Sequence, residues 1–430
     1  MVELRFNQAV YLWNSVPLCP CSCSPQRVKK IVLGLFPIVS WLPAYRFREW
    51  VLSDIISGIN TGLVAVLQVP GHCLAFALLV NVPPGYGLYA AFFPVLVYFI
   101  FGTSRHISVG PFPVLSLMVG GVVTRLVPDD STGNGTSTNM SAINDERVMV
   151  AASVTFLSGV VQLLLGIFQF GFIVIYLSQS LISGFTTAAA IHVVVSQLKF
   201  MLQLPTLESI FSQITETNIA DLVTSLVVLL IVFVVKEMND RYKEKLPTPI
   251  PIELLVVTLI SHFVNFEEKF NVAVVGKLEE GFQAPVAPDV GILQNTIGDG
   301  ISIAIVGFAV AFSVAKVYSI KHDYPIDGNQ ELIAFGLGNI VGGSFKGFAS
   351  STALSRSGVQ ESTGGKTQIA GIISSVIVLV VILAIGFLLA PLQKVIWVVT
   401  FLAAVILGLD IGLATAVAFQ LLTVVIRSQM

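Results

Sequence analysis

Long apolar stretches separated by short polar turns cover almost the whole chain, and a helix needs about 20 mostly apolar residues to cross a bilayer. Several stretches are short or interrupted by Gly and Pro. The pattern predicts membrane helices near 51–80, 86–101, 109–127, 148–168, 172–200, 219–235, 250–266, 299–315, 330–343, 351–365, 368–390, 395–409 and 411–427. We therefore expect an all-α polytopic membrane protein, with a cytoplasmic N-terminal segment at 1–47 and a transmembrane domain at 48–430.

Two polar, glycine-rich islands interrupt this apolar pattern, at 102–113 and 350–371. The flanking apolar stretches place both islands at membrane depth, in matching positions of the two halves of the chain. Irregular backbone survives at that depth only where it lines a cavity or is buried in protein. A matched pair of interrupted segments is typical of the binding site of a transporter. The pattern therefore predicts a protein that carries a small solute across a membrane.

Composition supports the membrane class and argues against others. Of 430 residues, 55% are hydrophobic and 11% are charged, whereas soluble domains carry about 25% charged residues. The formal net charge of −2 gives no reason to expect nucleic acid as a partner. The sequence has no nucleotide-binding Walker motif, which argues against ATP-driven pumping. No nucleophile–base pair or metal-ligand set emerges, so we predict no enzyme activity, no cofactor and no metal.

Charge and glycosylation signals indicate the sidedness of the membrane domain. Arg46 and Arg48 lie just before the first long span and favour a cytoplasmic N-terminus. The loop 128–147 holds sequons at Asn134 and Asn139, which are used only on the lumenal or external side. Three crossings from a cytoplasmic N-terminus place that loop outside, so the two signals agree. Toward the other end the parity fails, and either the count is wrong or a crossing is missing.

Three cysteines, Cys19, Cys21 and Cys23, precede the membrane domain, and Cys73 lies inside it. Their spacing fits no zinc signature, and no histidine lies near enough to complete one. Inert thiols, reversible acylation close to the bilayer and metal binding remain open as interpretations.

The second island holds the strongest candidate for chemistry. Residues 351–357 suit the start of a short helix with Ser or Thr as its N-cap, and the first N–H groups of a helix have no internal partner. Their partial positive charge of roughly half a unit suits an anion. Arg356 adds a full charge, and an Arg deep in a membrane is costly enough to indicate function. The alternative is a structural Arg that bridges helix ends through backbone carbonyls.

The first island offers the mirror-image arrangement. Gly110 and Pro111 are predicted to start a half-helix that faces the other one, because proline is tolerated in an opening turn. Phe112 would then form an apolar wall for a partly dehydrated anion, although core packing gives the same sequence signal. We assign Arg105 and His106 to a short cytoplasmic turn and to helix-end pairing rather than to substrate.

Few charged residues fall within the predicted spans. Glu253, Glu331 and Glu361 would relay protons or neutralise a nearby base. Glu361 lies five residues after Arg356, so a same-face pair with it is not assured. Lys316 ends an apolar run and either reaches toward the cytoplasm or faces the cavity.

The islands and two further runs resemble the sulphate permease and solute carrier 26 family of anion transporters. The resemblance is carried by 84–89, 101–111, 327–331 and 353–371. It extends over nearly the whole chain from about residue 25 onward. It implies a seven-plus-seven inverted repeat with halves at about 51–266 and 299–427, a core domain that moves against a gate domain, and a homodimer.

The resemblance also implies an anion site between the facing N-termini of the third and tenth helices. Its contacts would be Phe76 from the first helix, Phe112 from the third, and Ser355 and Arg356 from the tenth. Gln68 and Glu253 are secondary candidates. Proton-coupled sulphate members have an acid in the eighth helix where this chain has Lys316, which favours chloride exchange for bicarbonate or a similar monovalent anion.

The chain departs from the family pattern in three places. Residues 69–73 separate Gln68 from 74–76, which rotates a helix by about 40° beyond one full turn, and the Pro and Gly within them would kink or break it. At 391–397 the sequence skips a stretch that holds the twelfth helix in relatives, which accounts for the parity failure. The sequence also ends before the cytoplasmic STAS domain of relatives, so we expect the chain to lack both parts.

The predicted function is secondary active anion exchange in the plasma membrane, most simply of chloride for bicarbonate, by a homodimer surrounded by lipid. A channel-like anion uniporter is a second hypothesis, and large unitary currents without counter-anion dependence would favour it. A third is a non-transporting variant that is retained in the endoplasmic reticulum with untrimmed glycans at Asn134 and Asn139.

Overall fold

The computed structural model describes residues 34–66, 72–128, 137–172, 184, 187 and 283–385. Within these ranges the regular structure is helical apart from two strands of three residues each. Several predicted features lie outside the described residues. They are Gln68, Asn134, Glu253, the three N-terminal cysteines, the junction at 391–397, and the helices predicted at 219–235, 250–266, 395–409 and 411–427.

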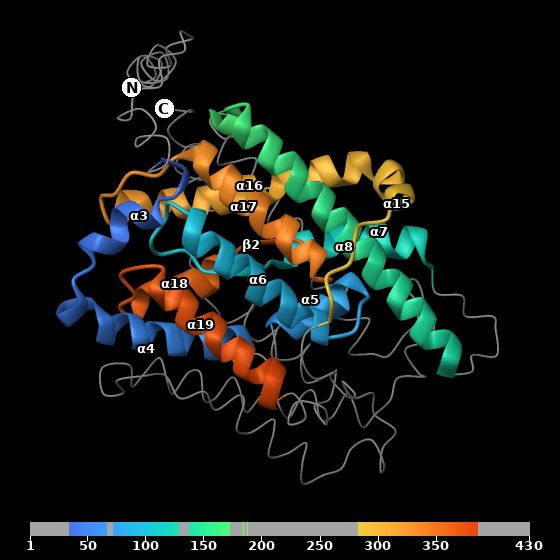
Figure 1. Cartoon of the computed structure of the whole chain (residues 1–430), viewed down its shortest axis with the longest axis horizontal. Helices are drawn as coiled ribbons and strands as arrows, with labels where there is room; N and C mark the ends of the chain where they lie inside the picture. Colours follow the sequence, from blue (N-terminus) through green and yellow to red (C-terminus); the bar gives the residue numbers. More distant parts are fainter. Residues whose placement is uncertain are drawn as a thin grey trace, which may run out of the picture.

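Two segments far apart in the sequence repeat one order of elements (Figure 1). The first, after α3 (Ile38–Trp41) and η1 (Leu42–Ala44), contains α4 (Phe47–Val66), α5 (His72–Val80), α6 (Gly85–Phe101), β1 (Val109–Pro111), α7 (Pro113–Leu126), α8 (Ser137–Ile167) and η2 (Phe170–Phe172). The second, after α15 (Val290–Asn295), contains α16 (Ile297–Lys321), α17 (Gly328–Ser344), β2 (Ser350–Thr352), α18 (Leu354–Ser362), α19 (Ile369–Val380) and the π-helical turn η4 (Val381–Ile385). Each segment therefore leads from helices through a short strand into a short helix and then another helix.

The two segments interlock reciprocally. The last long helix of the first segment, α8, packs against α16 and α17 of the second. The corresponding helix of the second segment, α19, packs against α4 and α6 of the first. Between them β1 and β2 pair antiparallel, with Gly110 opposite Ser351. This reciprocal packing supports the inverted repeat that the family resemblance implies.

Small residues permit the closest of these contacts. A Cβ added to Gly159 of α8 would lie 2.6 Å from the backbone nitrogen of Ile340, and one added to Gly336 of α17 would lie 2.6 Å from that of Leu163. Both distances are shorter than real Cβ contacts, so the two helices meet backbone to backbone. Such small-residue contacts are typical of helix pairs in membranes, where dispersion contacts contribute much of the association energy.

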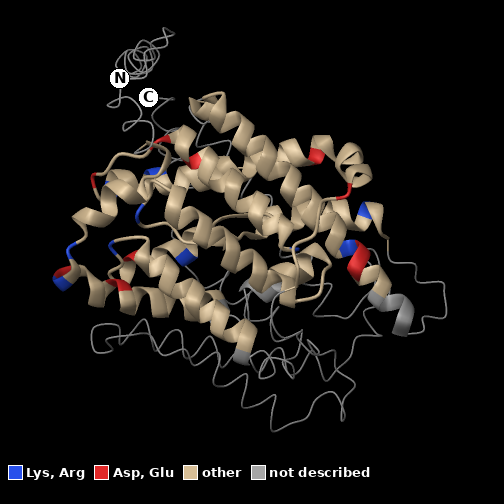
Figure 2. Cartoon of the chain, viewed as in Figure 1, with Lys and Arg blue, Asp and Glu red and all other residues tan. Residues whose placement is uncertain are grey.

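The helix predictions at 86–101, 299–315 and 330–343 are confirmed within a few residues by α6, α16 and α17. The single span predicted at 51–80 is wrong, because α4 ends at Val66 and α5 begins at His72. The predicted break by Pro and Gly falls between these two helices. Figure 2 shows charged residues mainly toward the ends of the described helices, as expected for segments that bury apolar length.

The predicted loop at 128–147 is helical over its second part. The helix α8 begins at Ser137, so Asn139 lies within its first turns. The hydropathy pattern finds only the apolar part of this helix, since its first turns are polar and extend beyond that part. Among the described residues, 142–167 and 297–321 are long and apolar enough to span a membrane by themselves.

Candidate functional site

The strand pair β1–β2 brings two helix N-termini together. The helix α7 starts at Pro113 after the extended residue Phe112, and α18 starts at Leu354 after the extended residue Ala353. Neither preceding residue caps its helix through a side-chain hydrogen bond among the described residues. The first N–H groups of both helices therefore carry their partial positive charge toward the strand pair.

Both predicted helix starts need correction by two or three residues. The first half-helix begins at Pro113 rather than at Gly110 or Pro111, because 109–111 form β1. The second has Ala353 rather than Ser or Thr before its first residue. The nearby hydroxyls bind elsewhere: Ser351 Oγ donates to the carbonyl of Gly307 at 2.8 Å, and Thr352 Oγ1 donates to that of Ser108 at 3.0 Å.

Arg356 reaches from α18 across to β1. Its side chain is only 2% exposed. Nε donates to Ser108 Oγ at 3.1 Å, Nη1 to the Pro111 carbonyl at 3.3 Å and Nη2 to the Ser108 carbonyl at 3.4 Å. These bonds match the structural alternative of an Arg that bridges through carbonyls. They also fix a full positive charge beside the two helix N-termini, so one geometry serves both interpretations.

Gly110 provides the space for this guanidinium. Its φ is +151°, and a Cβ added there would lie 2.9 Å from Nη2 of Arg356. Any larger residue would strain the backbone and push the guanidinium away. The sequence offered Gly110 only as part of a helix start, and its partner 246 positions later is visible only once the strands are paired.

The predicted aromatic contacts lie on the α5–α7 side. Phe76 is buried in α5 within an apolar cluster that includes Leu115 of α7, and Phe112 is half-buried and packs against the same cluster. Ser355 is half-buried as the second residue of α18. Of the secondary candidates, Lys316 is exposed on α16. The structure thus brings an apolar side and a polar side to the same strand pair.

A buried amide network, not anticipated from the sequence, holds β2 in place. Asn339 of α17 donates to Gln162 of α8 at 3.0 Å and accepts from the backbone N–H of Ser350 at 2.8 Å. Gln162 in turn donates to the Ala304 carbonyl of α16 at 3.0 Å. These two residues, an Asn and a Gln inside predicted apolar spans, were the available signal. Their bonds position the strand that leads into α18.

Glu331 pins the first polar island to α17. Its buried carboxylate accepts from the hydroxyl of Tyr98 at 2.9 Å and from the backbone N–H groups of Thr103 at 2.8 Å and Ser104 at 3.2 Å. The carboxylate therefore holds the turn that leads into β1. Of the two roles predicted for it, neither a proton relay nor pairing with a base is among these contacts.

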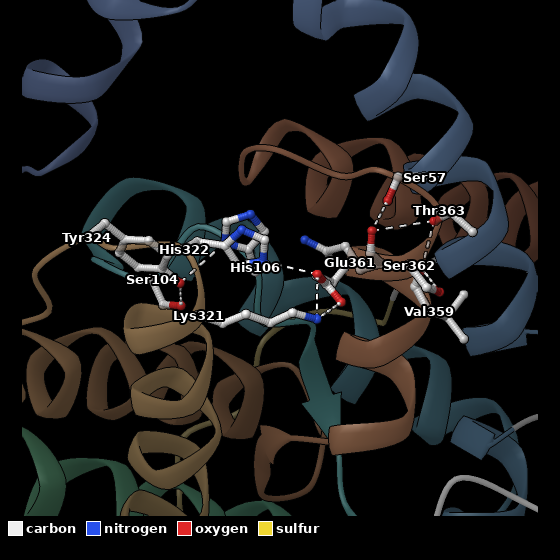
Figure 3. A network of polar contacts seen from close by, with 11 residues as sticks. Ser57, Ser104, His106, Lys321, His322, Tyr324, Val359, Glu361, Ser362 and Thr363 are labelled. Carbon is white, nitrogen blue, oxygen red and sulfur yellow. Dashed lines mark hydrogen bonds and ion pairs between the residues drawn. The ribbon is translucent and has the colours of Figure 1, made fainter.

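Glu361 belongs to a second polar cluster, at the end of α18 (Figure 3). Its carboxylate accepts from Lys321 at 3.0 Å and from His322 at 3.1 Å. Of its two predicted roles, this geometry supports neutralising a nearby base. The base lies at the end of α16.

His106 is packed beside this cluster. Its ring stacks on that of His322 with centroids 4.0 Å apart, and Arg105 lies 5.5 Å from the ring of Tyr324. These contacts support the assignment of Arg105 and His106 to pairing at helix ends. Burial, followed by the nearby charge of His322, lowers the pKa of the His106 imidazole from 6.5 to about 3. His106 is therefore neutral at physiological pH.

Comparison with known proteins gives a consistent result. The profile of the Sulfate permease family matches residues 51–425. The chloride anion exchanger of Mus musculus is 62% identical over 459 residues, covering 95% of this chain and 60% of that protein. Mus musculus pendrin is 50% identical, covering 90% of this chain and 52% of that protein. The chain thus spans 60% or less of the length of these two relatives.

A solved structure is similar as well. The murine solute carrier 26 family member A9 anion transporter, in the inward-facing state, superposes with a TM-score of 0.81 and 34% sequence identity. The match covers 92% of this chain and 66% of that one.

Proposed function

The chain belongs to the sulfate permease family, and on that premise we propose that it is a secondary active anion exchanger that trades chloride for bicarbonate by alternating access. The observation that carries the proposal is the meeting of the α7 and α18 N-termini at β1–β2 with the Arg356 guanidinium held beside them. Each helix N-terminus contributes about half a positive charge and Arg356 a full one. An anion would bind there without a metal or cofactor.

The residues around this point divide the work of binding. Arg356 supplies charge, Ser355 supplies a backbone N–H from the first turn of α18, and Phe76 and Phe112 supply an apolar wall. An apolar wall removes water from a weakly hydrated anion and strengthens its attraction to the fixed charges. Gln68, Glu253 and Lys316 stay secondary candidates for lining the path to the site.

Chloride is proposed as one substrate because a relative of 62% identity is named a chloride anion exchanger. Bicarbonate follows from the family resemblance and from the presence of Lys316 where proton-coupled members carry an acid. We further propose a seven-plus-seven inverted repeat, a homodimer and a plasma-membrane location. The reciprocal packing of α8 and α19 supports the repeat.

Intracellular pH in cells that express the chain tests this proposal, with surface labelling of the same sample. Removal of external chloride should draw chloride out and bicarbonate in, so the cytoplasm should become alkaline and recover when chloride returns. Protein that reaches the surface and leaves this pH unchanged would contradict the exchange mechanism. Asn134 and Asn139, if they are used, would report surface delivery through trimmed glycans.

A further inference from the structure

Two buried polar side chains at α4 and α18 have no hydrogen-bond partner within the part of the chain that the structure describes. Gln360 is 0% exposed, and neither its Nε2 nor its Oε1 is bonded. Thr61 is also 0% exposed, and its Oγ1 is not bonded. Buried polar groups nearly always bind protein, water or a ligand, because leaving them without a partner costs free energy. These two side chains therefore indicate a small polar occupant.

The main chain of Gln360 is firmly held, which fixes where its side chain starts. Its carbonyl accepts from Ser57 Oγ at 2.7 Å and from the Gly365 N–H at 2.9 Å. Figure 3 shows Ser57 reaching α18 from the neighbouring helix α4. Thr61 follows Ser57 by one turn on α4, so both hydroxyls lie on the face that packs against α18.

Gln360 also shares a face with Arg356. The buried residues of α18 are Arg356, Ser357 and Gln360, and the first and last of these are four positions apart. Four residues of an α-helix rise about 6 Å and return to nearly the same face. An anion beside Arg356 therefore lies about one helical turn from the carboxamide, and a small anion that moves along this face meets both.

A carboxamide distinguishes the two proposed substrates by its hydrogen bonding. It presents an N–H donor and a C=O acceptor side by side. Bicarbonate offers the complement, an acceptor oxygen next to an O–H donor, and can form both bonds. Chloride only accepts, so it would leave Oε1 without a partner. A site that bonds a substrate O–H discriminates against a substrate that lacks it.

We propose that Gln360, with the hydroxyl of Thr61, forms a second contact for the transported anion, one turn from Arg356, that favours bicarbonate over chloride. This inference rests on the proposed exchange function and assigns the choice of substrate within the same site.

The test uses the purified full chain in proteoliposomes. Chloride uptake is measured against internal chloride and against internal bicarbonate, for wild type and for Gln360→Leu. Loss of the donor–acceptor pair should lower chloride/bicarbonate exchange by at least about tenfold. Chloride/chloride exchange should stay within about twofold of wild type, because Arg356 and the helix N-termini are retained.

Gln368→Leu is the matched control. Its Nε2 donates to the carbonyls of Ser104 and Ile107, both at 2.9 Å, so this amide already has protein partners. The control should unfold at a lower temperature and keep the ratio of the two exchange rates. Thermal unfolding gives a second readout without transport: bicarbonate should protect wild type from heat, Gln360→Leu should lose that protection, and protection by chloride should remain.

The outcomes separate the inference from the function on which it rests. Unchanged rates and unchanged bicarbonate protection in Gln360→Leu would mean that water alone occupies the two groups, and would overturn the inference. An equal loss of both rates would assign Gln360 a structural role and would also overturn it. Wild type that exchanges neither anion would overturn the proposed function itself.

Discussion

The two arms that meet at the strand pair share a backbone design and differ in chemistry. In both arms a three-residue strand leads through one extended residue into a helix without a side-chain cap among the described residues. The helix α7 is mostly apolar and packs with α5 around buried side chains such as Leu115. The buried face of α18 consists of Arg356, Ser357 and Gln360. The repeat thus supplies one geometry twice, and the side chains make one arm a wall and the other a charged, hydrogen-bonding surface.

The arms also differ in what holds them. Packing suffices for the apolar arm, since its side chains fill space in a buried cluster. The polar arm depends on specific bonds from other helices, such as the Asn339 amide on β2 and the Ser57 hydroxyl on Gln360. The backbone N–H of Ser108 likewise donates to Ser357 Oγ at 2.9 Å. We therefore expect the β2–α18 arm to be the more sensitive to single substitutions.

The largest stability effect is expected where the polar arm is braced. Asn339→Leu would leave the N–H of Ser350 and the Gln162 carbonyl without their partner, which costs roughly 2–4 kcal/mol for a buried pair of groups. The apparent unfolding temperature of the purified chain should fall by several degrees, and exchange should fall with it. The double variant Asn339→Leu with Gln162→Leu should recover part of the loss, because fewer buried polar groups then lack a partner. Equal stability of Asn339→Leu and wild type would remove this difference between the arms.

Gly110→Ala tests the point where the arms touch. The methyl group meets the guanidinium of Arg356, and the φ of +151° is strained for any residue but glycine, so we expect destabilisation of about 1–3 kcal/mol and weaker chloride binding. Gly121→Ala in α7 is the control, since a Cβ there has no neighbour within 4 Å. It should be neutral or slightly stabilising, because alanine favours a helix by about 1 kcal/mol over glycine.

A smaller effect is expected from the apolar wall. Phe112→Ala should weaken chloride affinity by roughly threefold to tenfold, about 1 kcal/mol, through loss of half-buried apolar area. Phe112→Leu should retain most of the affinity. Radiolabelled chloride uptake at several chloride concentrations measures both. Loss of all transport in Phe112→Leu would show that the aromatic ring has a role beyond forming a wall.

The smallest effect concerns pH and the cluster beside the polar arm. The pKa of folded His106 is lowered to about 3, so the unfolded chain binds more protons below pH 6.5. Stability contributed by neutral His106 is therefore full above pH 6.5 and lost as the pH falls toward 3, by about 1 kcal/mol per pH unit. His106→Gln should flatten the unfolding temperature between pH 6.5 and 5. An unchanged pH profile in this variant would contradict the assignment.

Sequence patterns predicted the two islands, their half-helices and the break in the first span, because apolar runs and Gly–Pro interruptions are local signals. They placed the starts of α7 and α18 two or three residues too early or with the wrong cap. The strand pairing that moves those starts joins residues such as Val109 and Thr352, which are far apart in the chain. Ser108 and Gly110 as partners of Arg356 depend on the same pairing. No periodicity reports such contacts, so the site's chemistry was accessible from sequence and its internal bonds were not.

Chloride affinity in Arg356→Gln tests the central claim most directly, namely that an anion binds between the two helix N-termini beside this charge. Radiolabelled chloride uptake into proteoliposomes would compare wild type, Arg356→Gln, Arg356→Lys and Ser108→Ala. Ser108→Ala removes a bond to Arg356 and keeps the charge, so it controls for structural loss. We expect at least a tenfold weaker affinity in Arg356→Gln, about 1.4 kcal/mol or more, with an intermediate value in Arg356→Lys and near wild-type affinity in Ser108→Ala. Unchanged chloride affinity in Arg356→Gln would contradict the account.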